Sequence, residues 1–181
     1  MSLVFLLGGA RSGKSALAVR LAERSGLPVI FLATAEARDE EMAERIARHR
    51  AARPAGWTTI EEPVDLAGAL DRVPADSCLV LDCLSLWVSN LLERGLDEET
   101  IERHAEEAAA RVARREPLSV AVSNEVGLGV VPASDLGRRY RDLLGRVNAI
   151  WAEAASDAAL VAAGRLVPLA RATSVFGGLG D

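Results

Sequence analysis

The sequence predicts a single α/β domain in which a mostly parallel β-sheet has helices on both faces. The chain of 181 residues has the length of one ordinary α/β domain. Half of the residues are hydrophobic but only 4% are aromatic, so Ala, Val, Leu and Ile must build the core. Short apolar runs alternate along the chain with helical segments, which is typical of parallel strands joined by crossover helices.

The expected strands are short runs of apolar and β-branched residues. They span residues 3–7, 29–33, 57–60, 77–81, 118–122 and 159–163. The segments between them have helical periodicity, and the expected helices span residues 16–24, 39–53, 64–73, 84–93, 97–115 and 135–155. Asp39 is the expected N-cap of the second helix, and Pro54 ends it. The small, Gly-rich residues 172–181 are expected to form a mobile tail.

The charge balance and the cysteines narrow the possible functions. Lys and Arg number 21 and Asp and Glu 26, and the resulting net charge of −5 disfavours a general nucleic-acid binder. No apolar run approaches the roughly 20 residues of a membrane-spanning helix, and the N-terminal segment does not resemble an export signal. The spacing of Cys78 and Cys83 fits neither a zinc knuckle nor a redox-active pair. We therefore expect a protein of the reducing cytoplasm without a membrane span.

The most informative motif lies at residues 8–15, which match the pattern G-x-x-x-x-G-K-[ST] between an expected strand and an expected helix. Its glycines let the backbone wrap around a phosphate, and its amides and the helix N-terminus supply hydrogen-bond donors. Lys14 is placed to reach the β- and γ-phosphates, and the Ser15 hydroxyl is placed to bind Mg²⁺. The flanking elements favour a P-loop NTPase-like domain over residues 1–171 rather than a Gly-rich turn with an accidental lysine. The phosphate-binding residues are Gly8, Gly9, Ala10, Arg11, Ser12, Gly13, Lys14 and Ser15.

Other candidate residues follow the expected strands, at the edge of the sheet where ligands bind in α/β proteins. Asp82 ends a buried strand, where an acidic residue usually gives Mg²⁺ its second support, although it could instead cap the next helix. Residues 33–35 lie at the carboxyl end of the second strand. Asn124 and Glu125 follow the fifth strand, and they either cap a turn or lie near the substrate or metal.

The sequence contains only two histidines, His49 and His104. His49 shares a helix face with Met42, Ile46 and Arg53, a position that is more often structural than catalytic. The neighbouring arginines favour a neutral, nucleophilic imidazole and could hold a triphosphate against it. His104 lies in an acidic, Ala-rich segment and is expected at the surface.

Four segments together resemble the bifunctional adenosylcobinamide kinase/adenosylcobinamide-phosphate guanylyltransferase family of cobalamin biosynthesis, from Leu3 to about Leu169. The segments are residues 8–15; residues 33–35 with 39–46, 49–50 and 53–54; residues 81–87 with 89–92; and residues 123–132 with 138–142. Because many unrelated proteins share a phosphate loop, the second and fourth segments make the resemblance specific.

The resemblance implies a two-step enzyme. It phosphorylates the aminopropanol hydroxyl of adenosylcobinamide with a nucleoside triphosphate, either ATP or GTP, and then transfers GMP from GTP to adenosylcobinamide phosphate, releasing pyrophosphate. The transfer passes through a covalent GMP–histidine, which the resemblance places on His49, while Lys14, Mg²⁺ and the loop amides stabilise the leaving pyrophosphate. Beyond the phosphate loop, the resemblance implies nucleotide contacts from Ala33, Thr34, Ala35, Arg50, Ala51, Ala52, Arg53, Glu61 and Asp82. It also implies a symmetric trimer.

Two other functions stay open at the level of the sequence. A single-function P-loop kinase for a small molecule would use the loop, Lys14 and Asp82, and His49 would then be structural. A nucleotide-binding switch without a small-molecule substrate is disfavoured, because nothing in the chain resembles the guanine-reading motif of signalling GTPases.

Overall fold

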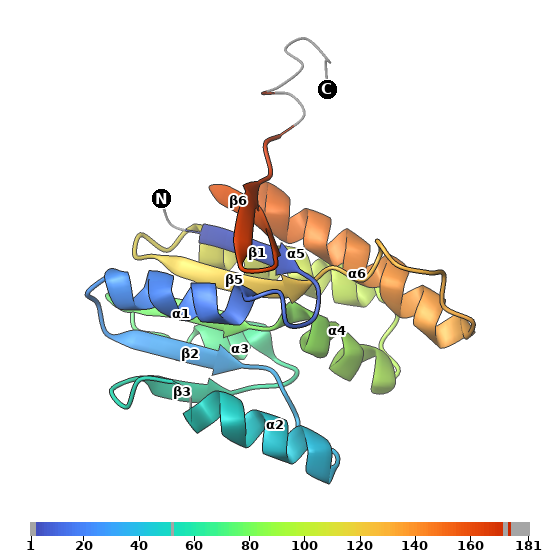
Figure 1. Ribbon diagram of the computed structural model, residues 1–181, viewed down its shortest axis with the longest axis horizontal. Coiled ribbons are helices and arrows are strands. Elements are labelled where there is room, and N and C mark those ends of the chain that lie inside the picture. The colour runs from blue at the N-terminus through green and yellow to red at the C-terminus, as the bar shows by residue number, and fades with distance from the viewer. Residues whose placement is uncertain (1–2, 52, 172–173, 175–181) are drawn as a thin grey trace.

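A seven-stranded sheet forms the centre of the computed structural model, which describes residues 3–51, 53–171 and 174 (Figure 1). The strands are β1 (Leu3–Gly8), β2 (Val29–Ala33), β3 (Thr58–Glu61), β4 (Cys78–Asp82), β5 (Ser119–Asn124), β6 (Asp157–Ala162) and β7 (Arg165–Pro168). The helices are α1 (Lys14–Arg24), α2 (Glu40–Ala51), α3 (Leu66–Leu70), α4 (Leu84–Glu93), α5 (Glu98–Ala113) and α6 (Asp135–Ala154). The expected mobile tail at 172–181 lies, apart from Ser174, outside the described residues.

The strand order brings the ends of distant segments together. The order is β3-β2-β4-β5-β1-β6-β7, and every neighbouring pair is parallel except β6 and β7. The register pairs Gly8 with Asn124 and Ala33 with Asp82. The residues that follow the parallel strands therefore meet at one edge of the sheet, and β5 lies between the strand of the phosphate loop and the strand of Asp82.

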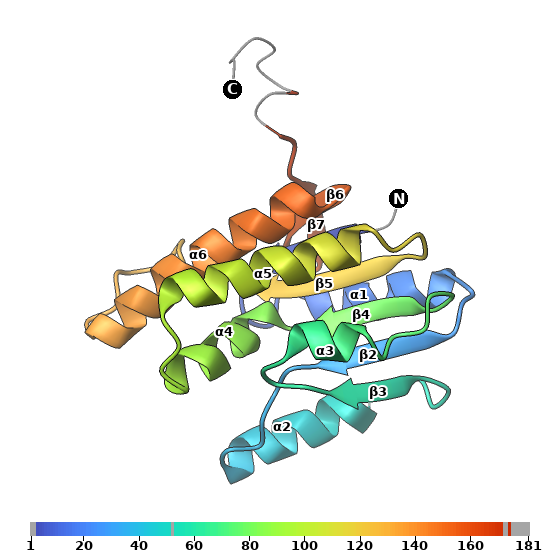
Figure 2. The same cartoon turned by 180° about the vertical axis from the view of Figure 1, so that it is seen from behind.

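Helices cover both faces of the sheet, as predicted. α1 lies on one face, and α3, α4, α5 and α6 lie on the other (Figures 1 and 2). Successive strand residues face opposite cores, so Phe5 packs on the side of α3–α6 and Leu6 on the side of α1. α2 lies beside β3 and contributes no buried residue. Its sequence is therefore not set by the packing of either core.

Four helices begin at other residues than predicted. α2 and α5 begin one residue later, at Glu40 and Glu98, and α1 and α3 differ by two residues. α1 begins at Lys14, directly after the loop, rather than at residue 16. α3 is shorter than the predicted 64–73, because the Asp65 side chain caps its start by accepting a hydrogen bond from the Gly68 amide at 2.9 Å. No helix of the described residues is long and apolar enough to cross a membrane.

Strand β7 is not predicted by the sequence. Ala163 and Gly164 have φ angles of 50° and 72° and form a two-residue turn that pairs β7 antiparallel to β6. All four residues of β7 are exposed, so the strand lacks the apolar pattern on which the prediction depends. Pro168 is tolerated there because β7 is an edge strand.

Candidate active site

The phosphate loop joins β1 to α1, and two of its residues adopt left-handed backbone conformations. Gly13 has a φ of 100° and Arg11 a φ of 57°. Gly8 is required for a different reason, since a Cβ atom there would lie 2.4 Å from the carbonyl oxygen of Val161 in β6. One glycine of the motif therefore permits the turn, and the other permits the close approach of β6.

Lys14 is buried at the start of α1, and its Nζ donates to the Gly9 carbonyl of its own loop at 3.0 Å. Burial lowers the pKa of Lys14, nearby Cys83 and Asp82 oppose this shift, and Arg45 adds to it. No salt bridge pairs Lys14 with a carboxylate in the part of the chain that the structure describes. The ammonium group is therefore available to bind an anion at the loop.

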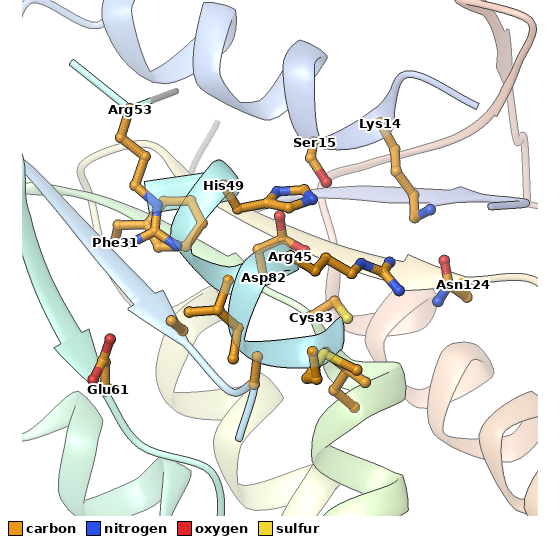
Figure 3. Close-up of a pocket in the computed structure, with 15 residues that line it drawn as sticks. Lys14, Ser15, Phe31, Arg45, His49, Arg53, Glu61, Asp82, Cys83 and Asn124 are labelled. Atoms are coloured by element: carbon orange, nitrogen blue, oxygen red, sulfur yellow. The ribbon is translucent and has the colours of Figure 1, made fainter. Parts of the chain in front are cut away.

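Two adjoining cavities open at the carboxyl edge of the sheet. The first, which we call the apolar cavity, is lined by Phe31, Ala33, Ala35, Met42, Ile46, Cys83 and Leu86 with Lys14, Ser15, Arg45, His49, Arg53, Glu61, Asp82 and Asn124 (Figure 3). The second, which we call the basic cleft, is lined by Ala10, Arg11, Ser12, Gly13, Glu41 and Arg48 and by a set shared with the apolar cavity. The shared residues are Lys14, Ser15, Arg45, His49 and Asn124.

Unpaired cations dominate the basic cleft. Among the described residues, Arg11, Arg45 and Arg48 form no ion pair, and the Nε of Arg48 contacts only the Glu44 carbonyl at 3.4 Å. Glu41 is the single acid among the described residues of the lining. Guanidinium groups gathered beside a phosphate loop without carboxylate partners favour a polyanionic ligand.

Helix α2 presents His49 to both cavities. The Asp39 side chain accepts a hydrogen bond from the Met42 amide at 2.7 Å, so the predicted N-cap is confirmed. Met42, Ile46 and His49 line the apolar cavity together, as their helical spacing predicts. His49 lines the apolar cavity together with Ser15 and Asp82 (Figure 3), and it is solvent-exposed. A ring nitrogen of His49 is thus accessible to a bound ligand.

Arg53 and Phe31 form one wall of the apolar cavity. The Arg53 guanidinium carbon lies 3.7 Å from the Phe31 ring centroid, and its Nη1 donates to the Thr59 hydroxyl at 3.1 Å. Burial lowers the pKa of Arg53, and the nearby Asp82 carboxylate opposes that shift. The wall therefore offers an aromatic face and a partly buried cation.

Only some of the other residues predicted to contact the nucleotide line the cavities. Arg50 forms an ion pair with Glu61, which lines the apolar cavity, while Arg50 itself does not. Ala51 is exposed and lines neither cavity, and Ala52 lies outside the described residues. Thr34 is buried, and its hydroxyl donates to the Cys83 carbonyl at 2.7 Å, which ties β2 to β4.

The residues at the ends of β4 and β5 also differ in whether they line the cavities. Asp82 faces the apolar cavity, and the N-cap of α4 is Cys83, so Asp82 does not serve as that cap. Burial raises the pKa of Cys83 to about 11, so the thiol is protonated and not a nucleophile at neutral pH. Asn124 lines both cavities, whereas the Glu125 carboxylate accepts a hydrogen bond from the Gly127 amide and lines neither.

Arg45, Arg48 and Phe31 line the site although no function was predicted for them. Arg45 precedes His49 by four residues, so the helical spacing that places His49 on a face places Arg45 there as well. Phe31 lies in an apolar strand, where nothing in the pattern separates a cavity wall from a core position. His104 is exposed on α5, as predicted.

Comparisons with known proteins identify the family of this chain. A family model described as cobinamide kinase / cobinamide phosphate guanyltransferase matches residues 4–169. The bifunctional adenosylcobalamin biosynthesis protein CobP of Pseudomonas aeruginosa is 47% identical over 165 residues, which are 91% of this chain and 95% of that protein. The bifunctional adenosylcobalamin biosynthesis protein CobU of Escherichia coli is 37% identical, covering 90% of this chain and 96% of that protein.

A solved structure supports the fold alone. The KaiC-like protein PH0186 from Pyrococcus horikoshii has a TM-score of 0.50 at 14% identity, over 88% of this chain and 70% of its own. The P-loop NTPase-like fold is thereby confirmed. Because the family model spans nearly the whole chain and two full-length relatives exceed one third identity, the chain belongs to the cobinamide kinase / cobinamide phosphate guanyltransferase family, whose enzymes act in cobalamin biosynthesis.

Proposed function

We propose that this chain carries out both reactions of its family at the site between the phosphate loop and α2. In the first reaction, the terminal phosphoryl group of ATP or GTP moves to the aminopropanol hydroxyl of adenosylcobinamide. In the second, GMP moves from GTP to adenosylcobinamide phosphate through a covalent bond to His49. Family membership supports the two activities, and the geometry of the cavities supports the assignment of the residues.

The position of His49 where the two cavities meet carries this proposal. The apolar cavity has the side chains to hold a nucleoside, and the basic cleft has the cations to hold phosphates. The α-phosphate links a nucleoside to its outer phosphates, so a GTP that spans both cavities brings its α-phosphorus to the shared wall. His49 is the nucleophile on that wall, and Lys14 and Arg45 are its cations.

In this mechanism a ring nitrogen of His49 forms a bond to the α-phosphorus of GTP. The bond between that phosphorus and the oxygen bridging to the β-phosphate breaks, and pyrophosphate leaves with the electron pair. Lys14, Arg45 and the loop amides stabilise its charge. A phosphate oxygen of adenosylcobinamide phosphate then attacks the same phosphorus, which breaks the P–N bond and yields adenosylcobinamide-GDP.

The donor set at the cavity fits Mg²⁺, with Ser15 and Asp82 as its protein ligands. Both side chains offer hard oxygen atoms on the wall of the apolar cavity. When bound, the ion would neutralise charge on the phosphates.

Labelling with GTP tests the transferase assignment. GTP labelled at the α-phosphorus, incubated with Mg²⁺ and protein but no corrinoid, should give an acid-labile protein adduct that is absent in His49→Ala. Part of the kinase activity should remain in that variant, since the loop is intact. The absence of labelled wild-type protein would leave the single-function kinase as the function.

We further propose a homo-oligomer, in accordance with the trimer that the resemblance implies, working in the cytoplasm. Exposed apolar side chains in the loop after β5 support a contact surface, with Leu128 83% and Val130 96% exposed. Sedimentation equilibrium at several concentrations tests the oligomer, and a monomer at every concentration would exclude it.

A further inference from the structure

A group of buried polar residues converges on Asn124. Its Nδ2 donates to the hydroxyl of Ser85, which is only 2% exposed, at 2.9 Å. Ser85 is held in turn, because the Tyr140 hydroxyl donates to its carbonyl at 3.1 Å and the Cys83 Sγ lies 3.0 Å from its Oγ. From α6, the Asn148 Nδ2 donates to the Asn124 carbonyl at 3.1 Å. Hydrogen bonds to Ser85 and Asn148 therefore hold both the side chain and the backbone of Asn124 in place.

This fixed side chain lies in the centre of the site. β5, which Asn124 ends, runs between β1 with the phosphate loop and β4 with Asp82. Asn124 lines both the apolar cavity and the basic cleft. Asn124 shares the lining of both cavities with Lys14 and Arg45, and in Figure 3 its amide oxygen points to the side of Lys14. The hydrogen bond to Ser85 thus turns the amide nitrogen back and presents the oxygen to the ligand.

An amide oxygen can bind the substrate group that reacts in the kinase step but not the one that reacts in the transfer step. An amide oxygen only accepts hydrogen bonds, and so do the oxygens of an ionised phosphate, so the two do not pair. A hydroxyl group donates. The kinase acceptor is a hydroxyl, whereas the acceptor of the guanylyl group is a phosphate. The Asn124 amide oxygen can therefore accept a hydrogen bond from the hydroxyl group of the kinase substrate. It forms no hydrogen bond with the ionised phosphate that receives GMP in the second step.

We propose that the Asn124 amide oxygen binds and orients the aminopropanol hydroxyl in the kinase step, and that Ser85 is the positioning residue that turns Asn124 toward it. This inference rests on the proposed function, in which one site serves both reactions. The hydroxyl oxygen forms a bond to the γ-phosphorus, the bond from that phosphorus to the β–γ bridging oxygen breaks, and the nucleoside diphosphate leaves. Asn124 directs the hydroxyl lone pair by holding its proton, which passes to solvent after transfer.

The experiment compares the two reactions in Asn124→Ala, Ser85→Ala and the double variant. Each single substitution should lower kinase kcat/KM for adenosylcobinamide by about tenfold more than it lowers the rate of GMP–protein formation. The double variant should have the same kinase defect as Asn124→Ala, because Ser85 acts through that side chain. Ser85→Thr, which keeps the hydroxyl, should restore the kinase. Ser89→Ala is the matched control, since Ser89 lies on the same helix but bonds Glu93 at 3.0 Å, away from the site.

Three results would overturn the inference. Equal losses in both reactions would assign Asn124 to nucleotide binding, and an intact kinase in Asn124→Ala would remove its role. Additive losses in the double variant would show that Ser85 does not act through Asn124. If Ser85→Ala melts before the assay temperature, Asn124→Ala and Ser85→Thr decide the matter. A wild-type protein that forms no GMP adduct would contradict the proposed transferase function, and the kinase measurements would still test Asn124.

Discussion

The Arg53 guanidinium lies 3.7 Å from the centre of the Phe31 ring, and together they close one side of the cavity that His49 faces. Phe31 does not lie at the end of a strand or in a loop. It lies within β2 and is 4% exposed, with its ring turned toward the site. This contact joins a core strand to the residue that follows α2, so the cavity wall is coupled to the helix that carries His49.

Phe31→Leu should weaken GTP binding without unfolding the protein. Leucine keeps most of the buried volume but removes the aromatic face on which Arg53 lies, a contact that contributes about 0.5–2 kcal/mol. We expect KM for GTP in adduct formation to rise about threefold to tenfold, with a smaller change in kcat. Phe5→Leu, a similar substitution on the other face of the sheet, is the control for stability. Equal GTP KM values for the two variants would show that Phe31 does not contact the nucleotide.

Lys14→Ala should abolish both activities, with each rate at least about 100-fold lower. The variant should nevertheless fold, because the ammonium is partly buried against the loop carbonyl of Gly9 and has no carboxylate salt bridge among the described residues. Steady-state kinase assays and α-labelled GTP measure the two losses, and thermal melting measures the fold. Arg20→Ala, on the exposed side of α1, is the matched control. Retention of either reaction in folded Lys14→Ala would mean that the two reactions use different phosphate sites.

Arg45→Gln should weaken the binding of pyrophosphate by about tenfold, because it removes one unpaired guanidinium from the basic cleft. It should also raise the pKa of Lys14, since Arg45 is among the groups that lower it. Calorimetric titration with pyrophosphate at two salt concentrations measures the first effect, and the salt dependence should be smaller in the variant. Arg24→Gln, at the far end of α1, is the control. Unchanged affinity would place the polyanion outside the cleft.

The sequence predicts the parallel strands and the phosphate loop because both follow from local patterns. The apolar runs of β1, β2 and β4 and the motif at residues 8–15 need no information from distant residues. The buried support of Asn124 does need such information. Ser85 and Asn148 reach Asn124, and Tyr140 reaches Ser85, only when α4 and α6 pack against β5. Likewise, the pairing of Arg50 with Glu61 depends on how α2 lies against β3, which no spacing along the chain encodes.

Glu98→Gln should destabilise the protein at neutral pH but not in acid. Glu98 accepts hydrogen bonds from Arg139 at 2.9 Å and from Arg146 at 2.6 Å, joining α5 to α6, and these bonds lower its pKa. A carboxyl group with a depressed folded-state pKa contributes stability above its unfolded pKa, and that contribution is lost as pH falls through the folded value. Because the Glu98 side chain is partly exposed to solvent, at 33%, the effect is screened and should shift Tm by only about 1–4 °C.

Thermal melting of wild type and Glu98→Gln at several pH values between neutral and strongly acidic conditions checks this. The two curves should differ at neutral pH and converge once Glu98 is protonated, and high salt should reduce the neutral difference. Glu99→Gln, the exposed neighbour with no ion pair among the described residues, should follow wild type throughout. A Tm difference that persists in acid would mean that the glutamine disturbs packing between α5 and α6, because the charged hydrogen bonds are already absent there.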